Sequence, residues 1–295
     1  MTLLTDHDVE EFKRHRWFIM HHREKCTICG KDFSNRQKKC YHIPMPDAKL
    51  WRYMDLAKFL SLLESSSLFF TRLDHFEDPF EGALGIQTNE DAWAIKEKTW
   101  RMLWLENERK SKKSNLSRGE LEVVASEKFK EYRENAKKWR KINYVCCWHQ
   151  SDSESEAMWK LYTRDTKQGI AIQTTFRRLY QSLPTVPQAD FGMVNYIDYK
   201  DYNNGRSSNT FHPFEAPWYK RKSFEHEKEF RIIIEDNSRE WNKKIKVDIN
   251  LLIENVYISP QADPWFTELV HSIIRNRYKL CLNICQSNLN ETPFY

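Results

Sequence analysis

The chain has 295 residues, of which 40% are hydrophobic and 30% charged, so it can form a sizeable core and is not expected to be disordered as a whole. Its net charge is +5, its seven cysteines are an odd number, and no apolar run approaches the roughly 18 residues of a membrane span. Because its start also lacks a signal-peptide pattern, we expect a cytoplasmic protein with thiols or metal-bound cysteines and no membrane partner.

A cysteine-rich segment follows a short helix expected at the N-terminus. Cys26 and Cys29 form a C-x2-C pair, and Cys40 and His42 follow after ten intervening residues. Three thiolates and one imidazole suit tetrahedral Zn²⁺, and four protein ligands would leave no open position, so the predicted zinc is structural. The alternative is a set of free thiols in a flexible basic segment.

The next part of the chain reads as strand, helix, strand and turn. Leu50 to Met54 is strand-like, and Asp55 is a suitable N-cap for a helix. That helix has apolar residues at helical spacing, namely Leu56, Phe59, Leu60 and Leu63. Leu68 to Thr71 predicts a short strand. Asp78 and Glu81 in "DPFEG" are most simply parts of a structural turn.

Residues 88–140 are predicted to be mostly helical and highly charged. Basic residues cluster in "ENERKSKKSNLSR" and "ENAKKWRKINY". Such clusters can contact nucleic acid phosphates, and the alternative is an ordinary solvated helix surface. This region reads as an insertion in the domain that surrounds it.

The second half of the chain alternates strands and helices irregularly. The predicted strands are "NYVCCWHQ", "GIAIQTT", "FGMVNYIDY", "KIKVDI", "NVYISP" and "KLCLNICQ". Ser153 is a plausible cap for the helix in "SESEAMWKLYTR", and Asp263-Pro264 opens another helix. Four cysteines in these strand-like runs are expected in the core, namely Cys146, Cys147, Cys281 and Cys285. The order indicates an α+β protein.

The stretch "SFEHEKEFRIII" raises a physical problem. If residues 223–234 form one strand, Glu225, Glu227, Glu229 and Arg231 lie on one face, where neighbouring carboxylates repel. One interpretation is an exposed edge strand in which Arg231 pairs with a glutamate. The other is a site that needs two carboxylates together.

Four segments, taken in order, carry a resemblance to known families. They are "LWRYMDLAKFLSLL", "HFEDPFEG", "CCWHQSDSESEAMWKLYTRDTKQGIAI" and "SFEHEKEFRIII". Together they resemble a widespread, poorly characterised bacterial family with R-Y, D-P-F-E, M-W-x-x-Y and E-x-E-x-R motifs, over about residues 48–290. The same order is similar to the ADP-ribosyltransferase superfamily. The resemblance implies an α+β domain at 48–295 with a split mixed sheet, carrying a zinc-knuckle extension at 1–47.

The resemblance also implies roles for individual residues, with NAD as the substrate. Glu229 matches the catalytic glutamate, and Glu227 matches an accessory one. The residues implied to contact NAD are Arg52, Tyr53, Trp159, Tyr162 and Arg231. The Ser-Thr-Ser motif of one transferase branch is absent, and Phe70-Thr71 is a weak substitute for it.

Four functions follow as hypotheses. The first is an NAD-dependent ADP-ribosyltransferase toxin of a toxin-antitoxin or phage-defence system, with a nucleic acid acceptor and an antitoxin or inhibitor partner. The second is an NAD glycohydrolase, which would use water as acceptor at the same site. The third is a non-catalytic zinc-containing protein that binds nucleic acid. A metal-dependent nuclease is weaker, because no suitable set of acidic ligands and general base is evident.

Overall fold

The computed structural model describes residues 44–83, 97–98, 101–102, 104–106, 108, 117–163, 166–183, 189–198, 213–238, 240–291 and 293–294. The four predicted zinc ligands lie outside these residues. Within them, no helix is both long enough and apolar enough to cross a membrane.

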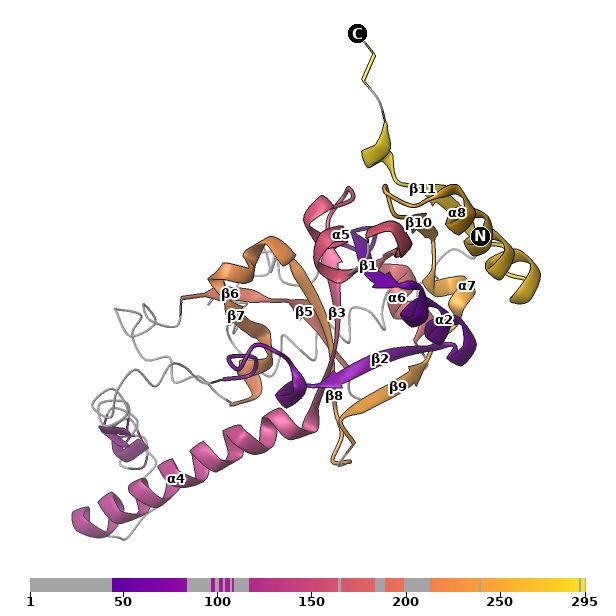
Figure 1. Ribbon diagram of the computed structural model, residues 1–295. Coiled ribbons are helices and arrows are strands. Elements are labelled where there is room, and N and C mark those ends of the chain that lie inside the picture. The colour runs from indigo at the N-terminus through magenta and orange to yellow at the C-terminus, as the bar shows by residue number, and fades with distance from the viewer. Residues whose placement is uncertain are drawn as a thin grey trace.

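The described chain is a mixture of helices and mostly antiparallel strands (Figure 1). The strands are β1 (Lys49–Asp55), β2 (Ser67–Arg72), β3 (Asn143–Gln150), β4 (Gly169–Thr175), β5 (Ala189–Met193), β6 (Asn195–Ile197), β7 (Tyr219–Arg221), β8 (Glu229–Glu235), β9 (Asn242–Lys246), β10 (Asn255–Ile258) and β11 (Asn283–Gln286). The helices are α2 (Leu56–Ser65), α4 (Arg118–Ile142), α5 (Glu156–Tyr162), α6 (Phe176–Ser182), α7 (Ile249–Leu252) and α8 (Pro264–Ser272). Short 3-10 helices include Leu73–His75, Pro213–Trp218 and Lys222–Glu227. The predicted α+β class is confirmed.

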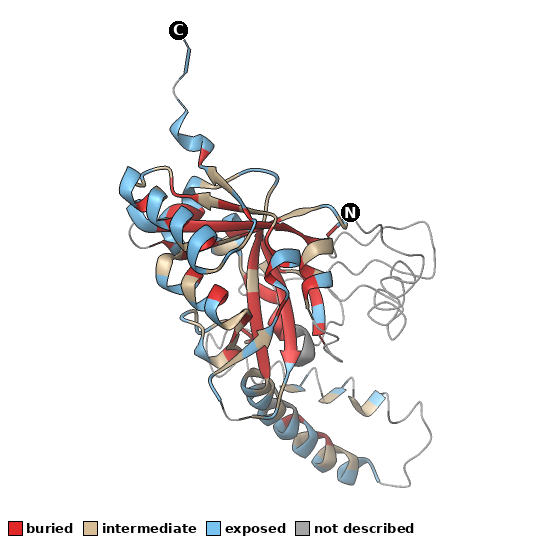
Figure 2. Cartoon of the chain, turned by 90° about the vertical axis from the view of Figure 1, so that its right-hand side faces the viewer, coloured by how far each residue is buried: buried red, intermediate tan, exposed pale blue. Residues whose placement is uncertain are grey.

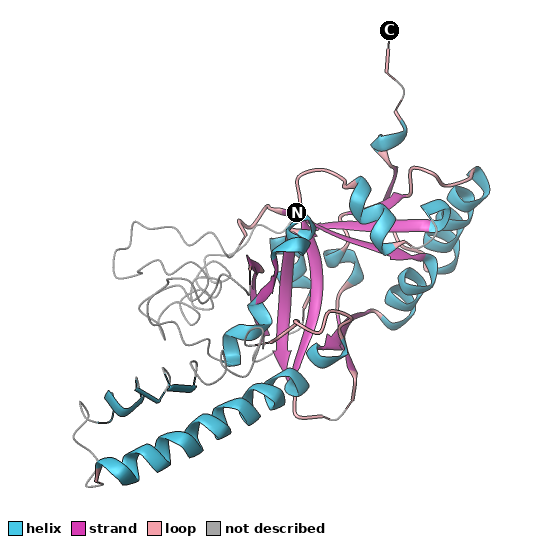
Figure 3. Cartoon of the chain, turned by 60° about the vertical axis from the view of Figure 1, so that its left-hand side comes forward, coloured by secondary structure: helices cyan, strands magenta, loops and turns pink. Residues whose placement is uncertain are grey.

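Nine of the described strands form one sheet. Seven run in the order β11-β10-β4-β1-β3-β2-β9, and β8 joins β3 to β5. In this sheet only β10 and β11 pair in parallel. A second, two-stranded sheet pairs β6 with β7. Figure 3 draws the strands in magenta and the helices beside them in cyan.

The sheet is split between β1 and β2. One edge of β3 pairs with β8 along its length, from Asn143 to His149. Its other edge pairs with β1 at Trp51↔His149 and with β2 at Thr71↔Val145. Between these two contacts the described strands leave the β3 edge uncovered near Cys146 to Trp148, so a space opens there.

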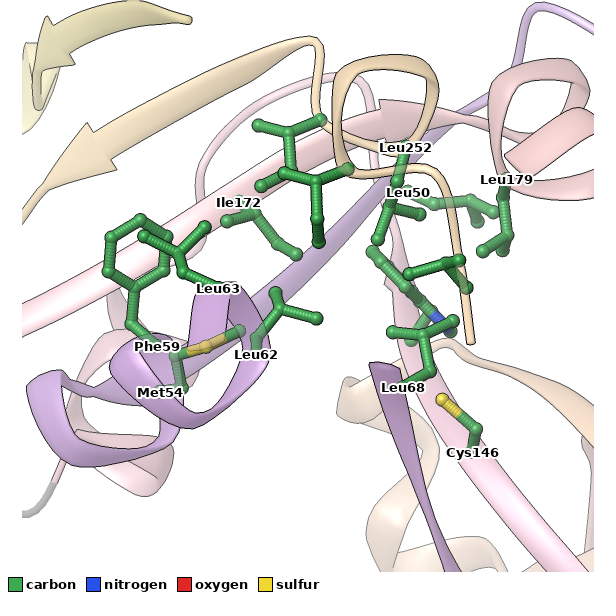
Figure 4. Packing of buried hydrophobic residues seen from close by; sticks show 14 of the residues in the cluster. Leu50, Met54, Phe59, Leu62, Leu63, Leu68, Cys146, Ile172, Leu179 and Leu252 are labelled. Atoms are coloured by element: carbon green, nitrogen blue, oxygen red, sulfur yellow. The ribbon is translucent and has the colours of Figure 1, made fainter. Parts of the chain in front are cut away.

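Helices α2, α6, α7 and α8 pack on the sheet and contribute side chains to the main core. Figure 4 shows part of it, with labelled residues of α2, α6 and α7 beside those of the strands. Phe59, Leu62 and Leu63 of α2 pack there because they recur at helical spacing on one side. Asp55 caps α2 as predicted, by accepting a hydrogen bond from the Lys58 amide at 2.8 Å. The isoleucine-rich centres of β4 and β8 lie in the same buried layer, drawn red in Figure 2.

Helix α4 projects from the sheet and is exposed along much of its length (Figures 1 and 2). Ser117 and Glu120 form a capping box at its start. Ala125 and Phe129 are buried, whereas Val123 is 61% exposed. The second half of the region predicted to be helical, 88–140, therefore does form a long helix.

Several sequence predictions need correction. The α5 helix is capped by Ser155, two residues after the predicted Ser153. Cys146 is buried as expected, but Cys147 and Cys285 are only partly buried and Cys281 is exposed. A single strand over 223–234 is wrong, because β8 begins at Glu229 and is preceded by a 3-10 helix. The exposed-edge interpretation is also wrong, since β8 pairs on both sides and is buried.

Candidate functional site

A cluster of five buried charged side chains lies at the start of β8. Lys220 of β7 approaches three carboxylates, with Nζ 2.7 Å from Glu227, 2.9 Å from Glu229 and 3.2 Å from Glu81. Arg231 contacts Glu229 through Nε at 2.7 Å and Glu81 through a terminal nitrogen at 2.7 Å. All five residues are at most 7% exposed. Two cations thus face three acids, which leaves one excess negative charge when all are ionised.

The local backbone explains how the two glutamates of the E-x-E pattern meet. Lys228 has a left-handed backbone, with φ of 41°, which ends the 3-10 helix and starts β8. The Glu229 amide donates to the Tyr196 hydroxyl at 2.7 Å. Glu225 points to solvent and is not in the cluster. The two acids are therefore adjacent because the buried cations hold them together. Alternation of residues along a regular strand is not the cause.

Glu81 reaches the cluster from the "DPFEG" turn. Asp78 accepts a hydrogen bond from the Phe80 amide and pairs with Arg221 of β7 at 2.9 Å. Gly82 follows with φ of +69°, a conformation that favours glycine, and a Cβ there would lie 2.4 Å from Leu73. Asp78 has the structural role that the sequence suggests. Glu81 also forms ion pairs with both buried cations, Lys220 and Arg231.

The two glutamates of β8 and its preceding turn differ electrostatically. Burial alone would raise the pKa of Glu229, but Arg231 and Lys220 outweigh it and lower that pKa to about 2. Burial raises the pKa of Glu227, and its one ion pair among the described residues, with Lys220, opposes that shift. One carboxylate is thus held ionised and its neighbour is more easily protonated. Such a division suits acid-base and charge-stabilising roles.

A pocket of about 470 Å³ opens beside this cluster, at the split between β1 and β2. We call it the split pocket. Residues far apart in the sequence line it, including Arg52, Tyr53, His149, Tyr162, Glu227 and Glu229. Its volume lies in the range of ordinary small-molecule sites. It combines aromatic walls, the carboxylate pair Glu227 and Glu229, and three cationic side chains, Arg52, Lys58 and Lys244.

Arg52 lines the split pocket from β1. Its guanidinium donates to the Cys146 sulfur at 3.1 Å and to the Phe69 carbonyl at 3.3 Å. It also lies over the Trp148 ring, 5.8 Å from the centroid. No described carboxylate pairs with Arg52, so its charge is available to an anionic ligand.

The predicted aromatic residues divide into a lining layer and a supporting layer. Tyr53 and Tyr162 line the pocket, and Tyr162 is 39% exposed. Trp159 lies behind Tyr53, with the ring centroids 5.0 Å apart and nearly perpendicular. Its indole nitrogen donates to Glu154, so it anchors α5 and is not itself on the pocket surface.

His149 is a lining residue that sequence reasoning missed. It is 3% exposed, and its Nδ1 lies 2.6 Å from the Glu227 carbonyl oxygen. Because a carbonyl can only accept, Nδ1 carries the hydrogen and Nε2 of the neutral ring is an acceptor. Burial lowers the pKa of His149, which favours this neutral form.

The structure brings together five of the seven predicted site residues of the domain. Glu227, Glu229, Arg52, Tyr53 and Tyr162 all line the split pocket. Arg231 and Trp159 lie one layer behind them. Glu81, Lys220 and His149 are additions. The sequence signal that could have identified them is a polar or charged residue inside an apolar or turn motif, in "DPFEG", "WYKR" and "CCWHQ".

In comparisons with known proteins, no family model, curated protein or solved structure matches this chain.

Proposed function

We propose that the protein is an NAD-dependent ADP-ribosyltransferase that uses the split pocket as its NAD site. The proposal is carried by one observation: Arg52, two tyrosines and the Glu227–Glu229 pair line a single pocket. These residues come from β1, α5, the end of the 3-10 helix Lys222–Glu227 and the start of β8. They are the positions that the family resemblance assigns to NAD, and the split between β1 and β2 agrees with the sheet it implies.

The chemistry gives each lining residue a role. Transfer of ADP-ribose breaks the bond between nicotinamide and ribose, and positive charge develops on the ribose ring. Glu229, held ionised by Arg231 and Lys220, provides a fixed negative charge for that transition state. Arg52 binds the diphosphate, and Tyr53 or Tyr162 stacks on nicotinamide.

Glu227 is the more available of the two acids. Its Oε2 accepts from Lys220, and no described residue donates to its Oε1. Glu229, in contrast, accepts hydrogen bonds at both oxygens from Arg231 and Lys220. We assign Glu227 to the ribose hydroxyls or the incoming acceptor, and Glu229 to charge stabilisation.

The proposed acceptor is nucleic acid, RNA or DNA. The net charge of +5 and the basic clusters around α4 favour a polyanionic partner. Cys26, Cys29, Cys40 and His42 would hold a structural Zn²⁺ in an N-terminal module that helps binding. A transferase of this kind would act as a toxin in phage defence or a toxin-antitoxin system, which requires an antitoxin or inhibitor.

The test uses labelled NAD with the wild-type protein and its Glu229→Gln and Glu227→Gln variants. Each is incubated with RNA, DNA, protein lysate or no acceptor, and free nicotinamide and incorporated label are followed. Glu225→Gln is the matched control, because Glu225 lies two residues before the E-x-E-x-R motif but is exposed. We expect the two site variants to lose at least about 100-fold in rate and the control to keep wild-type rates.

Nicotinamide release without incorporation would identify an NAD glycohydrolase that uses the same pocket with water. Absence of release and of NAD binding by the folded wild-type protein would refute both enzymatic proposals. Retained activity in Glu229→Gln would refute the role of the buried carboxylate.

A further inference from the structure

His149 presents an unused hydrogen-bond acceptor in the split pocket. The side chain is almost fully buried, yet Nε2 has no partner among the described residues. His149 lines the split pocket, and Nε2 is not among the fully buried polar atoms without a partner in the described residues, so it is reachable from the pocket. A molecule bound there can donate a hydrogen bond to Nε2 or pass a proton to it.

The ring of His149 is fixed on several sides. The Glu227 carbonyl holds Nδ1, and Tyr53 contacts the ring edge with centroids 6.2 Å apart. On the sheet, His149 pairs with Trp51 of β1 and with Glu229 of β8. These contacts set the tautomer and the ring plane before any ligand binds, which is what an efficient proton acceptor needs.

The acids next to His149 disfavour anionic nucleophiles at its end of the pocket. Glu229 is its partner on the sheet and the Glu227 carbonyl holds its ring, whereas the pocket lining as a whole also includes the cations Arg52, Lys58 and Lys244. A carboxylate or phosphate attacking the ribose from this end would be repelled. A neutral O–H or N–H group would not be repelled, but it must lose a proton as it attacks.

We propose that Nε2 of His149 takes the proton of the attacking group, and that the acceptor is a neutral O–H or N–H group of nucleic acid, such as a sugar hydroxyl or a base amide. The proposal rests on the proposed transferase function. The ribose–nicotinamide bond breaks and its electron pair leaves with nicotinamide. The acceptor oxygen or nitrogen bonds to the ribose carbon, and its proton passes to Nε2 and then to water.

His149→Asn is the informative variant. Asparagine can keep a donor near the position of Nδ1, and so the bond to the Glu227 carbonyl, while it removes Nε2. His271→Asn, at an exposed position on α8, is the matched control. The measurements are the transfer rate as a function of pH and the affinity for ADP-ribose, which binds but does not react.

The groups around His149 make the expected pH dependence definite. They are Glu229 on β8, Tyr53 on β1, Tyr162 on α5, and Glu227, Lys228 and His226 in and after the 3-10 helix. Burial lowers the pKa of His149; the hydrogen bond to the Glu227 carbonyl opposes this, Lys228 and His226 add to it, and the net shift is a lowering. The wild-type rate should therefore fall only below the ordinary histidine range, as the ring becomes protonated.

In His149→Asn we expect the transfer rate to fall about 100-fold or more and the acidic fall in rate attributed to His149 to disappear. The affinity for ADP-ribose should change less than about threefold, since the ligand contacts of Arg52 and the glutamates remain. An unchanged rate and pH profile in His149→Asn would refute the role of His149 alone. No nicotinamide release by the wild-type protein would refute the transferase itself, and this role of His149 with it.

Discussion

Lys220→Met is the most direct test of how the carboxylates are held together. Methionine has nearly the length of lysine but no charge. The substitution removes an ammonium group that contacts Glu81, Glu227 and Glu229 at once. Arg231 still neutralises part of the cluster, but Glu227 is left as a buried carboxylate without a described cationic partner.

The expected loss follows from that uncompensated charge. Removing one partner of a buried ion pair costs about 3–5 kcal/mol in the free energy of unfolding. Burial already raises the pKa of Glu227 in the wild-type protein, and loss of Lys220 raises it further. The folded variant then binds more protons than the unfolded chain, so its stability falls as the pH rises above about 4.3. The deficit is largest near neutral pH and smaller near pH 5.

Urea unfolding of the wild type, Lys220→Met, Glu227→Gln and the double variant at pH 5 and 7 measures this. Glu227→Gln added to Lys220→Met should recover at least about 1 kcal/mol, because it removes the unpaired charge. Lys222→Met, exposed in the same segment, is the control. A Lys220→Met protein within about 1 kcal/mol of the wild type at pH 7, with no recovery in the double variant, would contradict this reasoning.

Two further predictions concern stability. Since the pKa of Glu229 is lowered to about 2, its stabilisation, roughly 3 kcal/mol, should be complete above pH 4.5 and disappear as the pH falls towards 2; Glu229→Gln should lack that dependence in acid unfolding curves. Gly82→Ala should lower the free energy of unfolding by about 1–3 kcal/mol, because its φ is +69° and its new methyl group meets Leu73, whereas Gly119→Ala, with nothing within 4 Å, should be neutral or slightly stabilising in the same melts. Equal effects at the two glycines would show that the turn holding Glu81 is not constrained.

Local patterns in the sequence were enough to predict most regular elements. Apolar spacing and a capping aspartate identify α2, and a proline after Asp263 marks the start of α8. Boundaries were less accurate where two signals competed. Ser153 and Ser155 both suit a helix cap, and only the hydrogen bond from the Met158 amide shows that Ser155 is used. The strand predicted over 223–234 was wrong in its first half. Charged residues alternate there as they would in a strand, but the backbone of Lys222–Glu227 forms a 3-10 helix.

The sequence by itself determined which residue types to look for: two glutamates in an E-x-E pattern, an arginine on the first predicted strand, and tyrosines on a predicted strand and a predicted helix. These features depend only on residue types and on short spacings within a single strand or helix, so they can be read without the fold. Only the tertiary structure decided that Arg52, Tyr162 and Glu229 line one pocket, that Glu81 and Lys220 belong to the charge cluster, and that Nε2 of His149 is left as an acceptor. Those facts depend on strand order and burial, because a buried charge needs partners that the chain brings from distant positions.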